Sequence, residues 1–307
     1  MKKEDFYYPS SDGRTKIHAR SWTPDGEPKA VLQILHGMVE FIGRYGDFAA
    51  FLADHGYVVV GNDHLGHGES VVTDEDHGYF GENGNAHVIQ DIDRLRNMTS
   101  EKYPGLPYFM LGHSMGSFLV RQYITDHAAG LRGVIIMGTG WQPGAALTAG
   151  KALSSLIGKV KGKRYRSTFI NNMAIGAYNK QFKNPRTAAD WLTRDEEIVD
   201  WYLNEDWCTF MFTVDGYNNM FKGMQVAHDK KKMAGLPEGL PLLIVSGAED
   251  PVGGNGKGVR QTYEAYKKYS PCSVDIMLYE NDRHEILNEL DRAQVYEDLL
   301  AWLDDKI

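Results

Sequence analysis

The chain of 307 residues has only two cysteines, Cys208 and Cys272. Two cysteines cannot build a disulfide framework or a zinc knuckle, and a chain of this length can bury a large core without cross-links. The sequence also has no run approaching the roughly 20 apolar residues that span a bilayer. No apolar segment follows the charged N-terminus, as it would in a secretory signal. We therefore expect a cytoplasmic protein.

The sequence also has no excess of basic residues. It contains 33 lysines and arginines and 41 aspartates and glutamates, which gives a net charge of −8. Nucleic-acid-binding proteins usually present a basic surface, so we expect no nucleic-acid partner. Hydrophobic residues make up 42% of the chain and charged residues 24%, which are ordinary proportions for a globular protein. Disordered, collagen-like and coiled-coil chains are thereby excluded.

Strand-like and helix-like segments alternate along much of the chain. Residues 16–22 alternate apolar and polar side chains, as a half-buried strand does. Apolar runs of strand length follow at residues 30–35, 57–60, 108–111, 133–137, 242–245 and 274–278. Apolar residues at helical spacing occupy residues 45–55, 115–127, 259–269 and 290–303, and a further helix for which Asn85 is the expected N-cap. This alternation predicts an α/β fold with a mostly parallel sheet and helices on both faces.

Residues 141–235 interrupt the alternation. They contain no clear strand run and are predicted to be irregularly helical. We therefore expect one α/β core formed by residues 1–140 and 236–307, with residues 141–235 inserted as a helical cap.

A candidate nucleophile lies between a predicted strand and a predicted helix. The stretch Gly112-His113-Ser114-Met115-Gly116 matches the pattern G-x-S-x-G in the context that this pattern requires. The sharp turn exposes the serine hydroxyl, and free N–H groups at the helix start face developing negative charge. The alternative is a glycine-rich turn with an inert serine.

A serine hydroxyl needs a base to take its proton, and the base needs an acid to orient it. His284 follows the last predicted strand and is the expected base, whereas His228 lies in the insertion and is predicted to be a surface residue. Asp250 lies just beyond the strand at residues 242–245 and is the expected acid. The pattern does not exclude its neighbour Glu249.

An oxyanion hole needs a second backbone N–H from the loop after the strand at residues 30–35. We expect the N–H groups of Met38 and Met115 to be the two donors. His36 precedes Met38 by two residues, and we expect it to hold loop backbone rather than to act in catalysis.

Nothing in the sequence indicates a metal or a cofactor. His64 and His67 form a short loop pair, but no third residue has the spacing of a zinc ligand. A serine nucleophile with a histidine base needs neither. We therefore expect a cofactor-free enzyme.

Taken together, these stretches resemble the α/β-hydrolase superfamily, and more narrowly the monoglyceride lipase and lysophospholipase family, often grouped with serine aminopeptidase-like hydrolases. The matching stretches are residues 36–40, 43–45, 62–70, 112–117, 246–252 and 283–288. The resemblance implies the α/β-hydrolase fold, a triad of Ser114, Asp250 and His284, and an oxyanion hole at Met38 and Met115. The family often has a small residue at the position of Met38. Because a backbone N–H is used there, we expect methionine to reshape the acyl entrance without removing the hole.

The resemblance also implies a function, the hydrolysis of carboxylic esters of monoacylglycerol or lysophospholipid through an acyl-enzyme intermediate. One alternative is an aminopeptidase-like peptidase, which needs carboxylates to hold the substrate's ammonium group. The insertion offers Glu196, Glu197, Glu205 and Asp206 for that purpose. A second alternative is a non-catalytic binding protein of the same fold, although such a protein has no need of a complete triad.

Residues 127–189 contain no acidic residue. They hold ten basic ones, namely Arg132, Lys151, Lys159, Lys161, Lys163, Arg164, Arg166, Lys180, Lys183 and Arg186. An apolar stretch at residues 145–157 precedes the densest cluster, and such a combination suits transient contact with an anionic membrane surface or a phosphate-bearing substrate. The protein would then be cytoplasmic and peripheral to a membrane. The alternative is a solvated cap face with its own small core.

Overall fold

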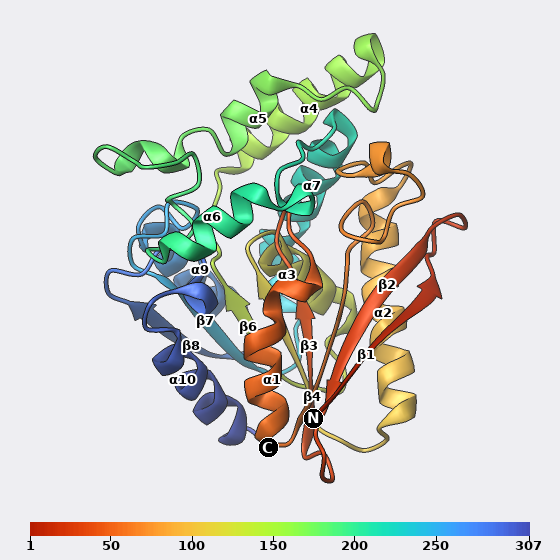
Figure 1. Cartoon of the computed structure of the whole chain (residues 1–307), viewed down its shortest axis with the longest axis vertical. Helices are drawn as coiled ribbons and strands as arrows, with labels where there is room; N and C mark the ends of the chain where they lie inside the picture. Colours follow the sequence, from red (N-terminus) through yellow and green to blue (C-terminus); the bar gives the residue numbers. More distant parts are fainter.

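A computed structural model describes all 307 residues and contains one eight-stranded sheet with the strand order β1-β2-β4-β3-β5-β6-β7-β8 (Figure 1). The strands are β1 (Lys2–Pro9), β2 (Lys16–Thr23), β3 (Ala30–Leu35), β4 (Tyr57–Asn62), β5 (Tyr108–His113), β6 (Leu131–Met137), β7 (Pro241–Gly247) and β8 (Ser273–Tyr279). The pairs β1–β2 and β2–β4 are antiparallel, and every other pair is parallel. The predicted α/β fold with a mostly parallel sheet is confirmed.

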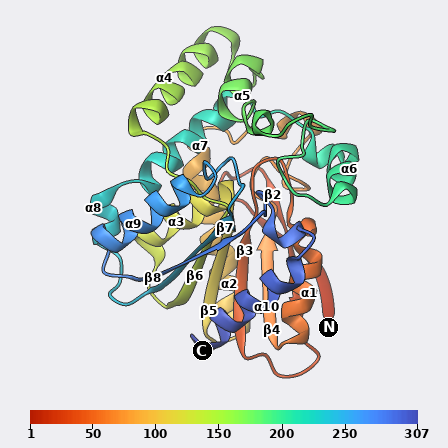
Figure 2. The same ribbon diagram turned by 90° about the vertical axis from the view of Figure 1, so that its left-hand side faces the viewer.

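Helices cover both faces of the sheet, so its inner strands are apolar on both sides. One face is covered by α1 (Gly46–Asp54) and α10 (Arg292–Asp304), and the other by α2 (Gly84–Lys102), α3 (Met115–His127) and α9 (Lys257–Tyr269) (Figure 2). Along β3, Val31 and Leu35 belong to the cluster under α2 and α3, whereas Leu32 and Ile34 belong to the cluster under α1 and α10. Because side chains along a strand alternate between the two faces of the sheet, β3 contributes residues to both hydrophobic clusters.

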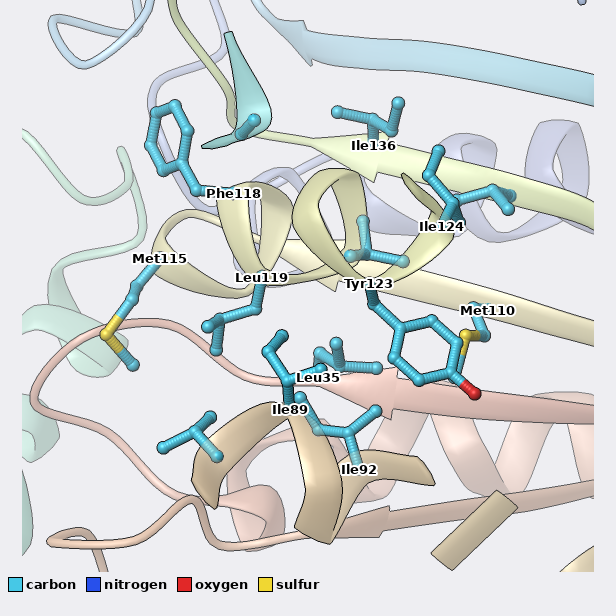
Figure 3. Packing of buried hydrophobic residues seen from close by; sticks show 14 of the residues in the cluster. Leu35, Ile89, Ile92, Met110, Met115, Phe118, Leu119, Tyr123, Ile124 and Ile136 are labelled. Carbon is cyan, nitrogen blue, oxygen red and sulfur yellow. The ribbon is translucent and has the colours of Figure 1, made fainter. Parts of the chain in front are cut away.

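The helix that follows the candidate nucleophile is fixed by apolar packing. Figure 3 shows Leu119 of α3 pointing toward Leu35 of β3 and toward Ile89 of α2. All three side chains are at least nine-tenths buried. Burying a side chain of this size stabilises the fold by about 1.5–3 kcal/mol, so α3 is held firmly against the sheet and α2.

The segment between β6 and β7 contains no strand. Its helices are α4 (Gly144–Lys161), α5 (Thr168–Ala174), α6 (Glu196–Asn204), α7 (Val214–Ala227) and α8 (Lys230–Ala234), and α4 to α7 lie above the sheet in Figure 1. Phe221 and Met224 of α7 join the same apolar cluster as α3. A separate small cluster comprises Ala189, Leu192 and Val199. The insertion is therefore anchored in the main core as well as in its own.

The start of α2 differs from the sequence prediction. The N-cap is Asn83, which has a left-handed backbone with φ 55°. Asn85, the expected cap, lies inside the helix and is buried, where its side chain exchanges hydrogen bonds with Gln122 of α3. None of the helices combines the length and the hydropathy required to span a membrane.

Candidate active site

Ser114 lies in the turn between β5 and α3 and has a strained backbone with φ 54° and ψ −117°. A non-glycine residue in such a region costs on the order of 1–3 kcal/mol and persists only where its surroundings enforce it. A Cβ atom on Gly112 would collide with the carbonyl oxygen of Gly116, and one on Gly116 would collide with that of Leu35. The two glycines of the pattern are therefore required for this turn to form.

His284 and Asp250 lie together after β8 and β7. Nδ1 of His284 is 3.0 Å from Oδ2 of Asp250, and both side chains are almost fully buried. Asp250 also accepts hydrogen bonds from the Ser246 hydroxyl at 3.0 Å and from the Val252 N–H at 2.8 Å. The adjacent Glu249 is exposed. Of the two candidate acids, only Asp250 contacts the histidine.

The surroundings of Asp250 favour its ionised form. Burial acts to raise the pKa of this carboxyl, but His284 and the donated hydrogen bonds outweigh burial and lower the pKa below its usual value. An ionised carboxylate can only accept, so Nδ1 of His284 carries the proton and Nε2 is the basic nitrogen. This arrangement can take a proton from a hydroxyl placed at Nε2.

Ser114 and His284 line one cavity with a volume of about 260 Å³. Of its 25 lining residues, 17 are hydrophobic, and they come from α3, α4, α5 and α7 as well as from the sheet loops. Among them are Phe118, Leu147, Met173, Met220, Phe221 and Met224. The cavity can therefore hold an apolar chain beside the serine.

Met38 and Met115 both line this cavity. Met115 is the first residue of α3, so its N–H has no acceptor earlier in its own helix. The loop that carries Met38 passes close to Ser114, since a Cβ atom on Gly37 would lie 3.0 Å from Cβ of Ser114. Both expected oxyanion donors thus lie in segments next to Ser114, and their role stays a prediction.

His36 holds the same loop from behind. Its Nδ1 lies 2.8 Å from the Gly37 carbonyl, and its Nε2 accepts a hydrogen bond from the His64 N–H at 2.9 Å. Burial, followed by the neighbouring His64 and His67, lowers the pKa of His36 well below its usual value. A neutral ring bonded to loop backbone agrees with the structural role expected for His36.

The prediction that His228 is a surface residue is wrong. Its ring packs edge-on against Trp141 with a centroid distance of 4.4 Å, and both ring nitrogens are buried without a hydrogen-bond partner. Burial, together with the positive charge of Arg121, lowers the pKa of His228 to about 3. The residue follows the C-terminus of α7, and because α7 lies against α3, the ring faces inward despite its charged sequence neighbours. It does not line the cavity of Ser114.

The sequence analysis did not predict a buried network of charged side chains that lies next to the candidate triad. His113 approaches Glu40 with Nδ1 at 3.2 Å and the His284 carbonyl with Nε2 at 3.2 Å. Arg44 binds Glu285 through two hydrogen bonds of 2.7 Å and Glu40 through one of 2.8 Å. In the sequence, the i, i+4 spacing of Glu40 and Arg44 was the signal that could have indicated their ion pair.

The network also sets the charge of His113. Burial acts to lower the pKa of this imidazole, but the hydrogen bond to Glu40 and the two nearby carboxylates outweigh burial and raise the pKa. Glu40 in turn accepts a hydrogen bond from the Gly37 N–H in the loop that carries Met38. The loop and the His284 backbone are therefore connected through Glu40 and His113.

One group of carboxylates has the proximity of a metal site. Oxygen atoms of Asp282, Glu289 and Asp291 lie within 4.8 Å of one another. The guanidinium of Arg194 already binds all three, at 2.5, 2.9 and 2.8 Å. The three carboxylates thus already share one arginine side chain as their cation.

The chain is similar to known hydrolases in sequence and in fold. The model of the family described as serine aminopeptidase, S33, matches residues 26–291. Human monoglyceride lipase is 24% identical over 97% of this chain and 89% of its own length. Monoacylglycerol lipase of Mycolicibacterium smegmatis is 26% identical over 95% and 94%. A solved structure of a thermostable carboxyl esterase from Bacillus coagulans in complex with glycerol has a TM-score of 0.92 at 27% identity and covers 99% of both chains.

Proposed function

Because the chain belongs to the serine aminopeptidase S33 family of α/β hydrolases, we propose that it is a serine esterase whose substrates are lipid esters, either monoacylglycerol or lysophospholipid. The observation that carries this proposal is the cavity shared by Ser114 and His284, in which 17 of 25 lining residues are hydrophobic. Such a lining favours a long acyl chain over a charged substrate. The similarity to monoglyceride lipases supports the same substrate class.

In the proposed mechanism, Nε2 of His284 takes the proton of Ser114 while the serine oxygen attacks the ester carbonyl. The N–H groups of Met38 and Met115 stabilise the negative oxygen that develops. The alcohol then leaves with the proton held by His284. A water molecule, deprotonated by the same nitrogen, hydrolyses the acyl-enzyme and releases the fatty acid. Asp250 keeps His284 in the required tautomer throughout.

We propose that residues 141–235 act as the cap over a core formed by residues 1–140 and 236–307. In support, Leu147 of α4, Met173 of α5 and Phe221 of α7 line the cavity across from Ser114 and its partners. An acyl chain would therefore be enclosed between the cap helices and the loops of the core.

The peptidase alternative has less support. None of Glu196, Glu197, Glu205 and Asp206 lines the cavity. The carboxylates that do line it are those of Glu40 and Glu285, and both are already bound to Arg44. No carboxylate is thus left to hold a substrate ammonium group. The paired His284 and Asp250 also argue against a binding protein without turnover.

A substrate panel tests this proposal. We expect kcat/KM for monoacyl esters to rise by about fourfold per added methylene while the chain still fits, since each buried methylene contributes about 0.8 kcal/mol. Peptide amides with a free N-terminus should be turned over at least about 100-fold more slowly, because the cavity leaves their ammonium group unpaired. A preference for such amides, or no dependence on acyl length, would contradict the proposal.

We also propose that the outer face of α4 and α5 contacts a lipid surface. Exposed apolar side chains gather there, namely Leu156, Val160, Phe169 and Met173, with exposed fractions of 60%, 74%, 66% and 51%. Lys159, Lys161 and Lys163 are exposed beside them. Both helices also line the cavity, so a lipid could pass from this face toward Ser114.

Only part of the basic stretch is free to meet anionic lipid. Several of its members are engaged within the protein: Arg164 pairs with Asp76, Arg186 pairs with Asp200, Arg132 and Arg166 donate to backbone carbonyls, and Lys151 donates to Gln225. We therefore assign the contact mainly to the apolar side chains, with a smaller contribution from the lysines at the end of α4.

Matched valine substitutions test the lipid contact. Val160→Glu should weaken partitioning onto anionic vesicles by about tenfold, since burial of one such side chain contributes roughly 1.5 kcal/mol. Val72→Glu, which changes a valine that is 52% exposed on the core, should leave vesicle binding unchanged. Turnover of a short soluble ester should be unaffected in both variants. Equal binding of wild type and Val160→Glu would leave a solvated cap face as the better description.

A further inference from the structure

A short segment of the insertion, residues 190–194, lies along the loop that carries His284. The Glu285 N–H donates to the Leu192 carbonyl at 2.7 Å, and the His284 N–H donates to the Trp191 carbonyl at 3.4 Å. The Thr193 hydroxyl donates to the Asn288 carbonyl at 2.9 Å. The expected base is therefore hydrogen-bonded through its own backbone to the insertion.

Side chains of the same segment extend this contact. The Trp191 indole lies against the His284 imidazole with a centroid distance of 5.1 Å and an angle of 37° between the rings. From the loop, the Arg283 guanidinium reaches back to the carbonyls of Asp190 and Thr193. Residues on both sides of the histidine, as well as the histidine itself, thus contact residues 190–194.

Arg194 closes the end of the segment with a buried charge cluster. Its guanidinium binds Asp282 and Glu289, whose side chains are fully buried, and the half-exposed Asp291. Glu289 also accepts hydrogen bonds from the Arg194 N–H at 3.1 Å and the Arg283 N–H at 2.9 Å. Asp282 and Arg283 directly precede His284, so the cluster fixes the backbone from which the histidine projects.

We propose that residues 190–194 are a positioning element for the catalytic base, and that Arg194 is its principal positioning residue. By pairing with three carboxylates at once, Arg194 keeps the loop at residues 282–289 closed against the insertion and so holds His284 in line with Ser114. This inference rests on the proposed role of His284. It gives the insertion a part in catalysis that is separate from enclosing the substrate.

Because the cluster contains a group that titrates near neutral pH, the contribution of Arg194 to kcat should depend on pH. Burial raises the pKa of Asp282 to about 7, with Glu289 and Asp291 acting in the same direction and Arg194 opposing them. The charged or titratable groups around Asp282 are Arg194 of the insertion, Glu289 and Asp291 of the following loop, Arg283 and His284 beside it, and Tyr279 at the end of β8.

The direction of the effect follows from these charges. Below a pH of about 7 Asp282 is protonated and the cluster needs Arg194 less. Above that pH Asp282 is ionised, and without the arginine its charge next to Glu289 and Asp291 is unfavourable, or Asp282 stays protonated at a free-energy cost. The decrease in kcat caused by removing Arg194 should therefore become larger as the pH rises.

The test measures kcat and KM for a short soluble ester between about pH 6 and 9. Arg194→Gln should lower kcat by about 100-fold at the alkaline end, the order of loss that a displacement near 1 Å causes. The loss should be clearly smaller at the acid end, and KM should change little because Arg194 does not line the cavity. Arg194→Lys keeps the charge but not the fork that spans three carboxylates, so it should lose less, in the same direction with pH.

A neighbouring ion pair provides the control. Arg186 pairs with Asp200 at 2.7 Å, both within the insertion, and its guanidinium contacts neither the carboxylate cluster nor residues 282–289, so Arg186→Gln should keep kcat near that of wild type at every pH. If Arg194→Gln does not fold, Arg194→Lys carries the test. The inference would be overturned if Arg194→Gln lowered kcat equally at all pH values, or if Arg194→Lys did not lower kcat at all. Failure of the proposed function is distinguishable, because wild type itself would then turn over no ester.

Discussion

Replacement of Ser114 by alanine is expected to lower kcat for ester hydrolysis by about 10⁵- to 10⁶-fold, the range seen when a serine nucleophile is removed from a complete triad. Ser114 is the residue at the strained turn, and it opens into the apolar cavity beside His284. Alanine relieves none of the backbone strain and removes only the hydroxyl, so the fold should be retained. Steady-state kinetics together with a thermal unfolding curve would check both points.

A second serine of the same helix provides the control. Ser117 lies three residues further on and is fully buried, and it does not line the cavity; its hydroxyl donates to the Ser114 carbonyl at 2.6 Å and lies 2.9 Å from the Thr139 hydroxyl. Ser117→Ala should cost stability by about 1 kcal/mol but keep kcat within about tenfold of wild type. Substantial esterase activity in Ser114→Ala would refute the serine mechanism.

Asp250→Asn is expected to lower kcat by roughly 10⁴-fold, because an amide at this position favours the wrong tautomer of His284. The carboxylate of Asp250 accepts from Nδ1 of His284 at 3.0 Å and is held by the Ser246 hydroxyl and the Val252 N–H. The kinetic constants of purified wild type and variant at one pH are sufficient to measure the effect.

Glu249→Gln is the matched control for this substitution. It makes the same chemical change one residue away, on a side chain that is exposed and has no contact with His284, so activity should be unchanged. If Glu249→Gln lost more activity than Asp250→Asn, the acid would have been assigned to the wrong residue of the pair.

The strands from β3 to β7 were predictable because inner strands of a sheet covered on both faces are continuous apolar runs. The edge strand β8 was predictable because most of its residues are apolar. β3 was predicted with the bounds that the structure shows. β1 was not predicted, because it is an edge strand whose residues, apart from Phe6 and Tyr8, are exposed. Its sequence therefore lacks the apolar signal by which a strand is recognised.

The triad candidates were predictable because residues that follow parallel strands meet at one edge of the sheet. The network of Glu40, Arg44 and Glu285 was not, because Arg44 and Glu285 are 241 residues apart in the chain and no local pattern marks their pairing. For the same reason the sequence could not show which residues of the basic stretch are paired. Arg164 pairs with Asp76, and Arg186 pairs with Asp200, only in the folded chain.

Labelling with a fluorophosphonate tests the central claim most directly, because this reagent reacts only with a serine that has been activated by its surroundings. The account predicts one adduct per chain, located on Ser114 by peptide mass spectrometry, with loss of esterase activity in proportion to labelling. Added chelator should alter neither result, and Ser114→Ala should not be labelled. An unlabelled wild-type protein that hydrolyses esters, or an adduct on another residue with Ser114 unmodified, would contradict the account.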